Sequence, residues 1–246
     1  MLIFWTKGFV NYKPLAEDFM PKTLQIRAAR RLMASLTFIA VFLLFPAGSL
    51  HFWQAWFLLG LMAMFWTSFL INLLKHDPQL VRRRLEGREA EPEQKLFQKL
   101  FTLILLTGLI VAGLDFRFGW SRALGFVPLW LAVTGQAATV AGYSFVFWVM
   151  KANTFAGTII QVESEQRVIS SGPYAIVRHP MYLGMCVTAL AMPVALGSSV
   201  ALIVFALLVP VLIYRLIHEE RILRRNLPGY AGYCEDTRFR LVPGVW

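Results

Sequence analysis

Polar, turn-forming residues set between two long apolar segments are the part of this sequence best equipped for chemistry. The run SGPYAIVRHPMYLG covers residues 171–184 and places Arg178 and His179 directly before Pro180. Proline suits the first position of a helix, where its missing N–H costs nothing. A helix that starts there would present free first-turn amides and the charge of Arg178 to an anionic group. Those amides belong to Met181, Tyr182 and Leu183.

Each of these two polar residues also has an ordinary structural role, which the sequence leaves open. Arg178 stands where positive residues anchor the cytoplasmic ends of membrane helices. His179 occupies the capping position before the expected helix. Considered alone, neither residue establishes a function.

Two neighbouring carboxylates, Glu219 and Glu220, directly follow the last apolar segment. Carboxylates are rarely placed beside anionic headgroups without a cation to bind. One interpretation is that a carboxylate binds the cationic group of a ligand. The alternative is a pair of helix salt bridges, because Arg215 lies four residues before Glu219 and Arg224 four residues after Glu220.

Aromatic residues follow the break at Leu227-Pro228-Gly229, with Tyr230 and Tyr233 placed shortly after it. These rings would either lie over an aromatic or cationic ligand or anchor the chain at the membrane interface. Taken with the arginine, the amides and the glutamates, they suit a zwitterion that carries an amine, a carboxylate, an aromatic ring and a sulfonium.

The order and spacing of these motifs resemble the C-terminal half of the isoprenylcysteine carboxyl methyltransferase family. The resemblance covers about residues 150–246, and its specific parts are GPYxxxRHPxYxG and the Glu-Glu pair. It implies an integral-membrane methyltransferase that uses S-adenosylmethionine, releases S-adenosylhomocysteine and reaches its acceptor from the bilayer. The spans before residue 150 do not visibly match, so the acceptor stays open among lipophilic carboxylates, thiols and lipid amines. A thiol or protonated amine would need a general base, which His179 or a glutamate could provide.

The resemblance also implies a set of site residues. The expected catalytic residues are Arg178, His179 and Glu219. The residues Leu241-Val242-Pro243 are expected near the adenosine part, and no metal site is expected. The expected cofactor-binding residues are Tyr174, Arg178, His179, Pro180, Tyr182, Leu183, Glu219, Glu220, Tyr230 and Tyr233.

The composition identifies a membrane protein. Of its 246 residues, 57% are hydrophobic and only 15% are charged, whereas soluble domains have about 45–50% and about 25%. The formal charge of +10 comes from Lys and Arg in short loops, which favours anionic lipid over nucleic acid as the partner. Cys186 and Cys234 lie in unlike settings, so neither a disulfide nor a metal site is expected.

Six apolar segments predict an all-α, polytopic bundle of about six membrane helices. We expect the third and fifth to be short, and tight turns at Gly48-Ser49 and Gly197-Ser198-Ser199. The segments are about Leu32–Leu50, Trp53–Leu74, Leu100–Asp115, Leu124–Met150, Tyr182–Leu196 and Val200–Ile217.

The basic residues predict the orientation. With both termini inside, the cytoplasmic segments hold 22 of the 24 Lys and Arg residues, and only Arg117 and Arg122 fall outside. The expected organisation is an interfacial segment over residues 1–31, membrane helices over 32–149 and a methyltransferase-like half over 150–246. That half includes a long cytoplasmic connection, Lys151–Val177, which would be either a lid or binding loop or a plain linker. The expected location is a bacterial inner membrane, with the cofactor site facing the cytoplasm.

Two other functions compete with methyl transfer. A membrane reductase of the sterol reductase type would use NADPH and share a similar C-terminal architecture. A non-enzymatic transporter or scaffold would not need the polar cluster on one face. Di-iron chemistry is excluded because the chain has only four histidines. The sequence does not indicate an oligomeric state.

Overall fold

A computed structural model describes residues 22–76, 78, 81, 82, 85, 92–125, 127–153 and 168–246 of the chain. Over these residues every regular element is a helix, which confirms the expected fold class. Most of the interfacial segment and of the 151–177 connection lies outside the described residues. The elements are α1 (Lys22–Ala47), α2 (Trp53–His76), α4 (Pro92–Phe118), α5 (Trp120–Gly125), α6 (Leu129–Ala152), the 3₁₀ helix η2 (Gly172–Ala175), α7 (Pro180–Ala195), α8 (Ser199–Ala206), α9 (Leu208–Asn226) and α10 (Tyr230–Asp236).

The helices are those of an integral membrane protein. Among the described residues, four helical segments are long and apolar enough to cross a bilayer. The α6 helix has spanning length without belonging to these four, and α7 is a shorter apolar helix. The count of six spans therefore remains a prediction. The four segments are Lys22–Ala47, Trp53–His76, Lys95–Phe118 and Ser199–Asn226.

Several predicted boundaries were wrong; the first helix, for example, begins at Lys22 rather than Leu32. The third apolar segment is not short, because α4 continues through the charged residues before it and spans 27 residues from Pro92. Lys and Gln are good helix formers, so hydropathy alone underestimates such a helix. The fourth helix begins at Leu129 rather than Leu124, since Pro128 precedes it in an extended conformation.

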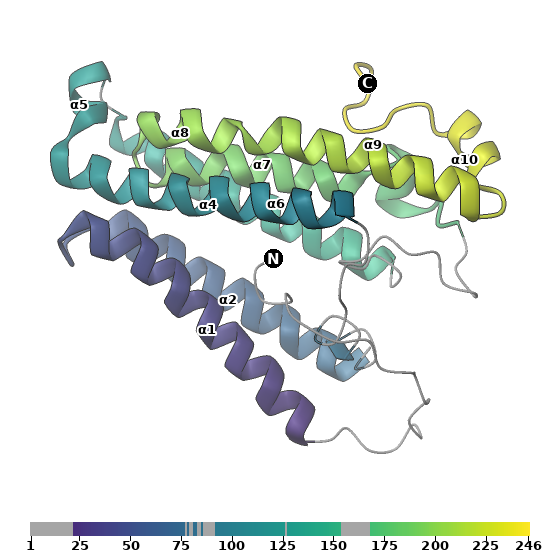
Figure 1. The fold of residues 1–246 in the computed structure, drawn as a ribbon, viewed down its shortest axis with the longest axis horizontal. Helices are drawn as coiled ribbons and strands as arrows, with labels where there is room; N and C mark the ends of the chain where they lie inside the picture. The colour runs from purple at the N-terminus through teal and green to yellow at the C-terminus, as the bar shows by residue number, and fades with distance from the viewer. Residues whose placement is uncertain are drawn as a thin grey trace.

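The helices form two groups that meet at one end (Figure 1). Helices α4, α6, α7, α8 and α9 run side by side, whereas the α1–α2 hairpin diverges from them towards the other end. The α1–α2 turn is made by Gly48 at φ +61, as expected, and Gly197 at φ +74 makes the α7–α8 turn. A side chain at Gly113 of α4 would collide with the main chain of Leu43 in α1, so the groups touch closely there.

Helices α6 and α7 are packed backbone to backbone. A Cβ added at Gly135 would lie 2.5 Å from the amide of Ala195, and one at Gly184 would lie 2.6 Å from Val146. Small residues allow such close approach between membrane helices. This contact holds the start of α7, and with it the Arg178-His179 motif, in a set place relative to α6.

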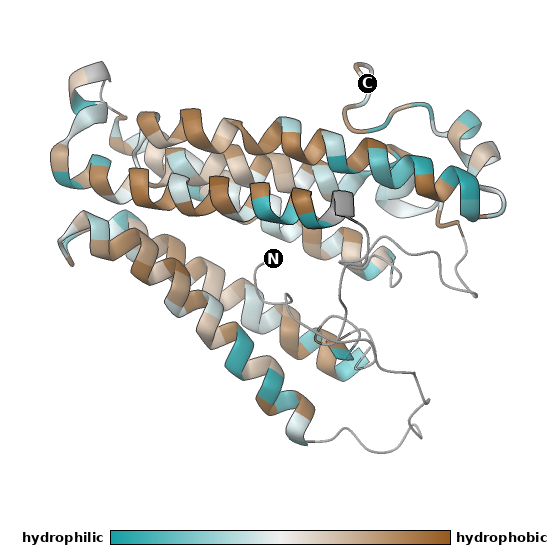
Figure 2. Ribbon diagram, viewed as in Figure 1, coloured by the Kyte–Doolittle hydropathy of each residue, from teal (hydrophilic) through white to brown (hydrophobic). Residues whose placement is uncertain are grey.

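Polar residues gather at one end of the long helices (Figure 2). The middle of the bundle is apolar, and the hydrophilic part of α9 lies near α10 and the C-terminal segment. Since α7 begins and α9 ends there, residues about 40 positions apart in the sequence are brought together.

A buried carboxylate joins three helices at the opposite end. Asp115 of α4 accepts a hydrogen bond from the main-chain N–H of Ser121, 2.7 Å away, and from the hydroxyls of Ser121 and Ser198. Ser198 also caps α8 by accepting from the N–H of Ala201 at 3.0 Å. Asp115 therefore connects the end of α4 to α5 and to the start of α8.

Replacing Asp115 by Ala should lower the melting temperature of the detergent-purified protein. The change leaves buried donors on Ser121 and Ser198 without an acceptor, which costs about 1–3 kcal/mol for each group left unsatisfied. Asp236→Ala, at an exposed position of α10, is the matched control. Equal melting temperatures for the two variants would show that the Asp115 contacts contribute nothing to stability.

Candidate functional site

The helix start at His179-Pro180 is confirmed. His179 is the residue before α7, and Pro180 is its first residue. The expected free amides are wrong for two of the three positions, because the N–H groups of Tyr182 and Leu183 donate to the carbonyl of His179 at 3.1 and 3.4 Å. These two amides are used within the first helical turn and are not available to a ligand.

The C-terminal segment holds the main chain on the other side of this helix start. The N–H of Arg178 donates to the carbonyl of Phe239, and the N–H of His179 donates to the carbonyl of Arg240, both at 2.9 Å. Two adjacent hydrogen bonds restrict both position and direction of the motif. The tail after α10 is therefore part of the site.

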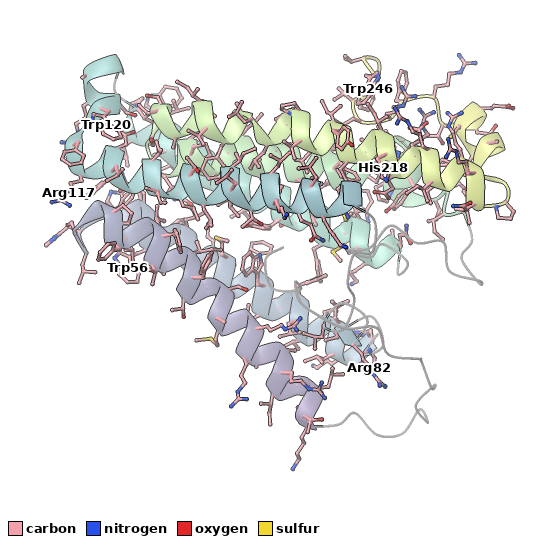
Figure 3. The ribbon with its side chains drawn as sticks, in the orientation of Figure 1. Trp56, Arg82, Arg117, Trp120, His218 and Trp246 are labelled. Carbon is pink, nitrogen blue, oxygen red and sulfur yellow. The ribbon has the colours of Figure 1, made fainter. Side chains whose placement is uncertain are left out.

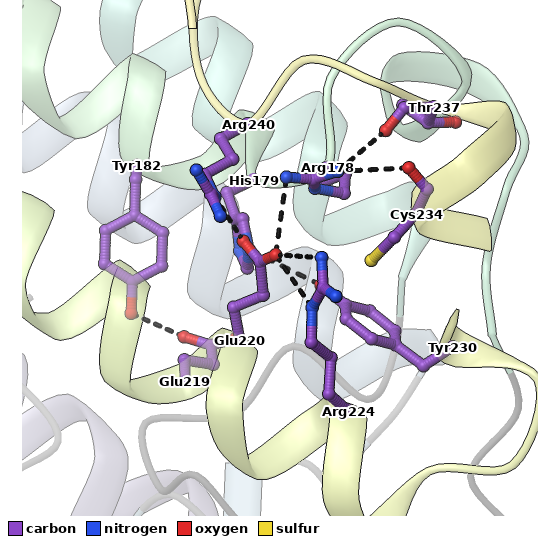
Figure 4. A network of polar contacts seen from close by, with 10 residues as sticks. All are labelled: Arg178, His179, Tyr182, Glu219, Glu220, Arg224, Tyr230, Cys234, Thr237 and Arg240. Carbon is purple, nitrogen blue, oxygen red and sulfur yellow. Dashed lines mark hydrogen bonds and ion pairs between the residues drawn. The ribbon is translucent and has the colours of Figure 1, made fainter. Parts of the chain in front are cut away.

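Glu220 is the centre of the polar cluster (Figure 4). Its Oε1 atom accepts from Arg224 Nε at 3.1 Å and Nη2 at 2.9 Å, and lies 3.3 Å from Arg178 Nη2. Its Oε2 atom accepts from Arg240 Nε at 2.8 Å and lies 3.6 Å from His179 Nε2. The side chain is only 4% exposed. The i,i+4 pair with Arg224, left open as the ordinary alternative, is therefore present, but it is one of several contacts.

The charges of this cluster do not balance. Three guanidinium groups contact one carboxylate, which leaves two positive charges in excess. Arg178 is buried and also donates through Nη1 to the carbonyls of Cys234 and Thr237, both at 3.2 Å. Its buried Nε atom has no hydrogen-bond partner among the described residues. Such a cluster favours an additional anionic group nearby.

Glu219 has surroundings unlike those of Glu220. It is half-buried, and one of its oxygens accepts a hydrogen bond of 2.5 Å from the hydroxyl of Tyr182. The two glutamates point to different groups (Figure 4). Glu220 is occupied by arginines, whereas Glu219 keeps acceptor capacity beside a phenol. The two carboxylates are not equivalent candidates for a cationic ligand.

Three of the four candidate tyrosines make further hydrogen bonds, and Tyr230 contacts the cluster through His179. The hydroxyl of Tyr230 lies 3.4 Å from His179 Nε2, and the hydroxyl of Tyr233 donates to the carbonyl of Tyr174 at 2.7 Å. Asn153 Nδ2 donates to the hydroxyl of Tyr174 at 3.2 Å, which ties the end of α6 to η2. Burial raises the pKa of Tyr233 to about 12 and raises the pKa of Tyr174 and of Tyr230 further. All three are therefore neutral hydroxyls at physiological pH.

A sharp turn after α9 brings α10 back over the cluster. Gly229 adopts φ +82, a conformation that few other residues accept, and α10 starts at the next residue. Tyr230, Tyr233 and Cys234 then pack with Leu227 in a small buried group. This confirms the expected break and shows that Tyr230 and Tyr233 are interior residues.

The remaining candidates are packing residues. Pro180 is buried, and Leu183 packs against a group that includes Tyr182 and Leu241. Leu241 is itself 6% exposed, so it belongs to this apolar group rather than to an open surface. Among the described residues, no three His, Cys, Asp or Glu side chains lie together as metal ligands, and both cysteines are free and buried.

Sequence reasoning missed Arg240 and the carbonyls of Cys234 and Thr237. They lie about 60 positions after Arg178, and no local spacing connects them to it. The one available signal was the position of Arg240 directly before the Leu241-Val242-Pro243 run. Tyr182 was expected at the site, but its bond to Glu219 was not.

Comparison with known proteins finds one matching family model. The sequence model of the phospholipid methyltransferase family matches residues 130–228, which include most of α6, all of α7 and α9, and the Arg178-His179 and Glu219-Glu220 motifs. No curated protein is significantly similar to the chain.

The fold is that of a known membrane enzyme. The structure resembles the eukaryotic intramembrane Ras methyltransferase, isoprenylcysteine carboxyl methyltransferase, with a TM-score of 0.59 and 15% identity. The match covers 91% of this chain and 81% of that one, so it includes the N-terminal helices, which showed no similarity in sequence. The expected resemblance is thus confirmed: the chain is an integral-membrane methyltransferase with an isoprenylcysteine carboxyl methyltransferase-like fold.

Proposed function

We propose that this protein transfers the methyl group of S-adenosylmethionine to a lipophilic acceptor at the cytoplasmic side of a bacterial inner membrane. The family match implies a methyl donor, and neither it nor the fold favours a reductase, a transporter or a scaffold. The observation that carries the proposal is the difference between the two adjacent carboxylates. Glu220 contacts the arginines, whereas the adjacent Glu219 contacts a tyrosine hydroxyl and can still bind a cation.

The residues present fit the proposed cofactor. The carboxylate of the cofactor would pair with the excess positive charge around Glu220. The buried Nε atom of Arg178, which has no hydrogen-bond partner among the described residues, would be one donor to it. The amine of the cofactor would pair with Glu219, whose position is set by the hydroxyl of Tyr182. The adenosine part would lie next to Tyr230, whose hydroxyl is 3.4 Å from His179 Nε2.

The bound cofactor supplies a methyl group that its sulfonium has already activated for in-line displacement. The protein therefore has to hold the cofactor and the acceptor, orient them towards each other and keep water away from them. Proper orientation alone can lower a barrier by roughly 7–11 kcal/mol. Arg178 and His179 are held by main-chain and side-chain contacts at once, which is the rigidity that such positioning needs.

The acceptor decides whether a base is required. A carboxylate acceptor needs none, whereas a thiol or a protonated amine must lose a proton. His179 or Glu219 would then be the base, since Glu220 is held by arginines. The match to a phospholipid methyltransferase family makes a phospholipid amine the first acceptor to test, and prenylcysteine the second.

Purified protein with labelled S-adenosylmethionine should methylate at least one lipophilic acceptor. The panel is phosphatidylethanolamine, prenylcysteine, a fatty acid and an alkyl thiol, each presented in the same detergent. NADPH oxidation in the presence of an unsaturated isoprenoid is the matched assay for a reductase. Oxidation of NADPH without any methyl transfer would refute the proposal.

Glu219→Gln should weaken S-adenosylhomocysteine binding by roughly tenfold to a hundredfold, because a charge-assisted hydrogen bond of about 1.5–3 kcal/mol is lost. Its melting temperature should change little. Glu220→Gln should instead lower the melting temperature strongly, since losing one partner of a buried ion cluster costs about 3–5 kcal/mol. Calorimetry and thermal unfolding on the same preparations measure both effects.

The control for these substitutions is Glu235→Gln, at an exposed position of α10. It should alter neither affinity nor stability. If Glu219→Gln binds S-adenosylhomocysteine as well as the control does, Glu219 does not hold the amine.

Reporter fusions test the proposed cytoplasmic site. Fusions after Leu50, Arg122 and Ser198 should give an external signal, and a fusion at Trp246 should give a cytoplasmic one, since basic residues stay inside. A cytoplasmic signal at Ser198 would mean that α7 and α8–α9 do not form a membrane hairpin. The site would then lack its expected orientation.

A further inference from the structure

We propose that Trp246 is a positioning residue for the candidate site, acting through Arg240. The expected effect on cofactor binding rests on the proposed function. It concerns a contact that neither the motifs nor the cluster of Glu220 explains. Trp246 lies near the polar end of the bundle, beyond α10 (Figure 3).

Arg240 is the least constrained of the guanidiniums that contact Glu220 from outside α9. It gives Glu220 a single hydrogen bond through Nε, and its side chain is 36% exposed. Arg178, by comparison, is 6% exposed and is held by two carbonyls as well. A partly exposed arginine with one hydrogen bond to Glu220 keeps rotamer freedom that a second contact can limit.

The ring of Trp246 supplies that second contact. The guanidinium carbon of Arg240 lies 5.3 Å from the centre of the Trp246 ring, within the range of a cation–π interaction. The guanidinium therefore contacts both a carboxylate and an aromatic ring. Arginine is suited to such a place, because its planar group can stack while its N–H groups bond.

The backbone brings Trp246 back to Arg240. The main-chain oxygen of Trp246 accepts from the N–H of Leu241 at 3.0 Å and of Val242 at 3.2 Å, and its own N–H donates to the carbonyl of Val242 at 3.1 Å. Gly244, at φ +76, makes the turn. Trp246 also packs against the apolar group around Tyr182 and Leu241.

The path from Trp246 to the site has three contacts. Trp246 orients Arg240, Arg240 bonds to Oε2 of Glu220, and this same oxygen lies 3.6 Å from His179 Nε2. The carbonyl of Arg240 also accepts from the N–H of His179. Loss of the ring would therefore loosen Arg240 and displace the charge that the Glu220 cluster presents.

A double-mutant cycle on the full chain tests this inference. Trp246→Ala should weaken S-adenosylhomocysteine binding about threefold to tenfold, in keeping with a lost cation–π contact. In an Arg240→Ala background the same substitution should have no further effect. Trp246→Phe, which keeps a ring, should restore most of the affinity. Trp120→Ala is the matched control, because Trp120 lies at the opposite end of the bundle (Figure 3).

A second readout needs no cofactor. In protein labelled with 5-fluorotryptophan, the ¹⁹F resonance that disappears in Trp246→Phe identifies Trp246. Arg240→Ala should shift this resonance and leave that of Trp120 unchanged. An unmoved Trp246 resonance overturns the contact, whether or not the protein binds S-adenosylhomocysteine.

The outcomes separate the two proposals. Failure of the unaltered protein to bind S-adenosylhomocysteine would refute the proposed function, and the ¹⁹F experiment would still decide whether Trp246 orients Arg240. Binding by the unaltered protein with equal affinity for Trp246→Ala overturns the positioning role alone. So does a loss of affinity that is the same in both Arg240 backgrounds.

Discussion

The buried carboxylate of Glu220 is the interaction on which the rest of the site depends. It draws together the start of α7 through Arg178, the end of α9 through Arg224 and the C-terminal segment through Arg240. Burying the carboxylate of Glu220 is costly unless cations compensate it, and burying Arg178 is costly unless a carboxylate compensates it. The three segments are thus energetically dependent on one another at a single point.

The two adjacent glutamates therefore have different roles. Successive positions on a helix point about 100° apart, so Glu219 faces Tyr182 of α7 while Glu220 faces the arginines. A chain that needs both a rigid charged centre and an available carboxylate can obtain them from one helical turn. The Glu-Glu pair is therefore better described as one structural residue and one binding candidate than as two interchangeable ligands.

Features that follow from local rules were predictable from the sequence. Proline at position 180 set the start of α7, glycines at 48, 197 and 229 marked real turns, and long apolar runs marked the membrane helices. Features that depend on tertiary contact were not. The main-chain hydrogen bonds of residues 178 and 179 with residues 239 and 240 join positions about 60 apart, and no local pattern in either segment predicts them. The prediction of free amides was wrong for a local reason. The N–H groups of Tyr182 and Leu183 donate to the carbonyl of His179 at the start of the same helix.

A structure of the protein with S-adenosylhomocysteine bound is the most direct test of this division. We predict that the cofactor amine lies within hydrogen-bond distance of Glu219, while Glu220 keeps its contacts with Arg178, Arg224 and Arg240. An amine bound to Glu220, with the arginines displaced from it, would contradict the account.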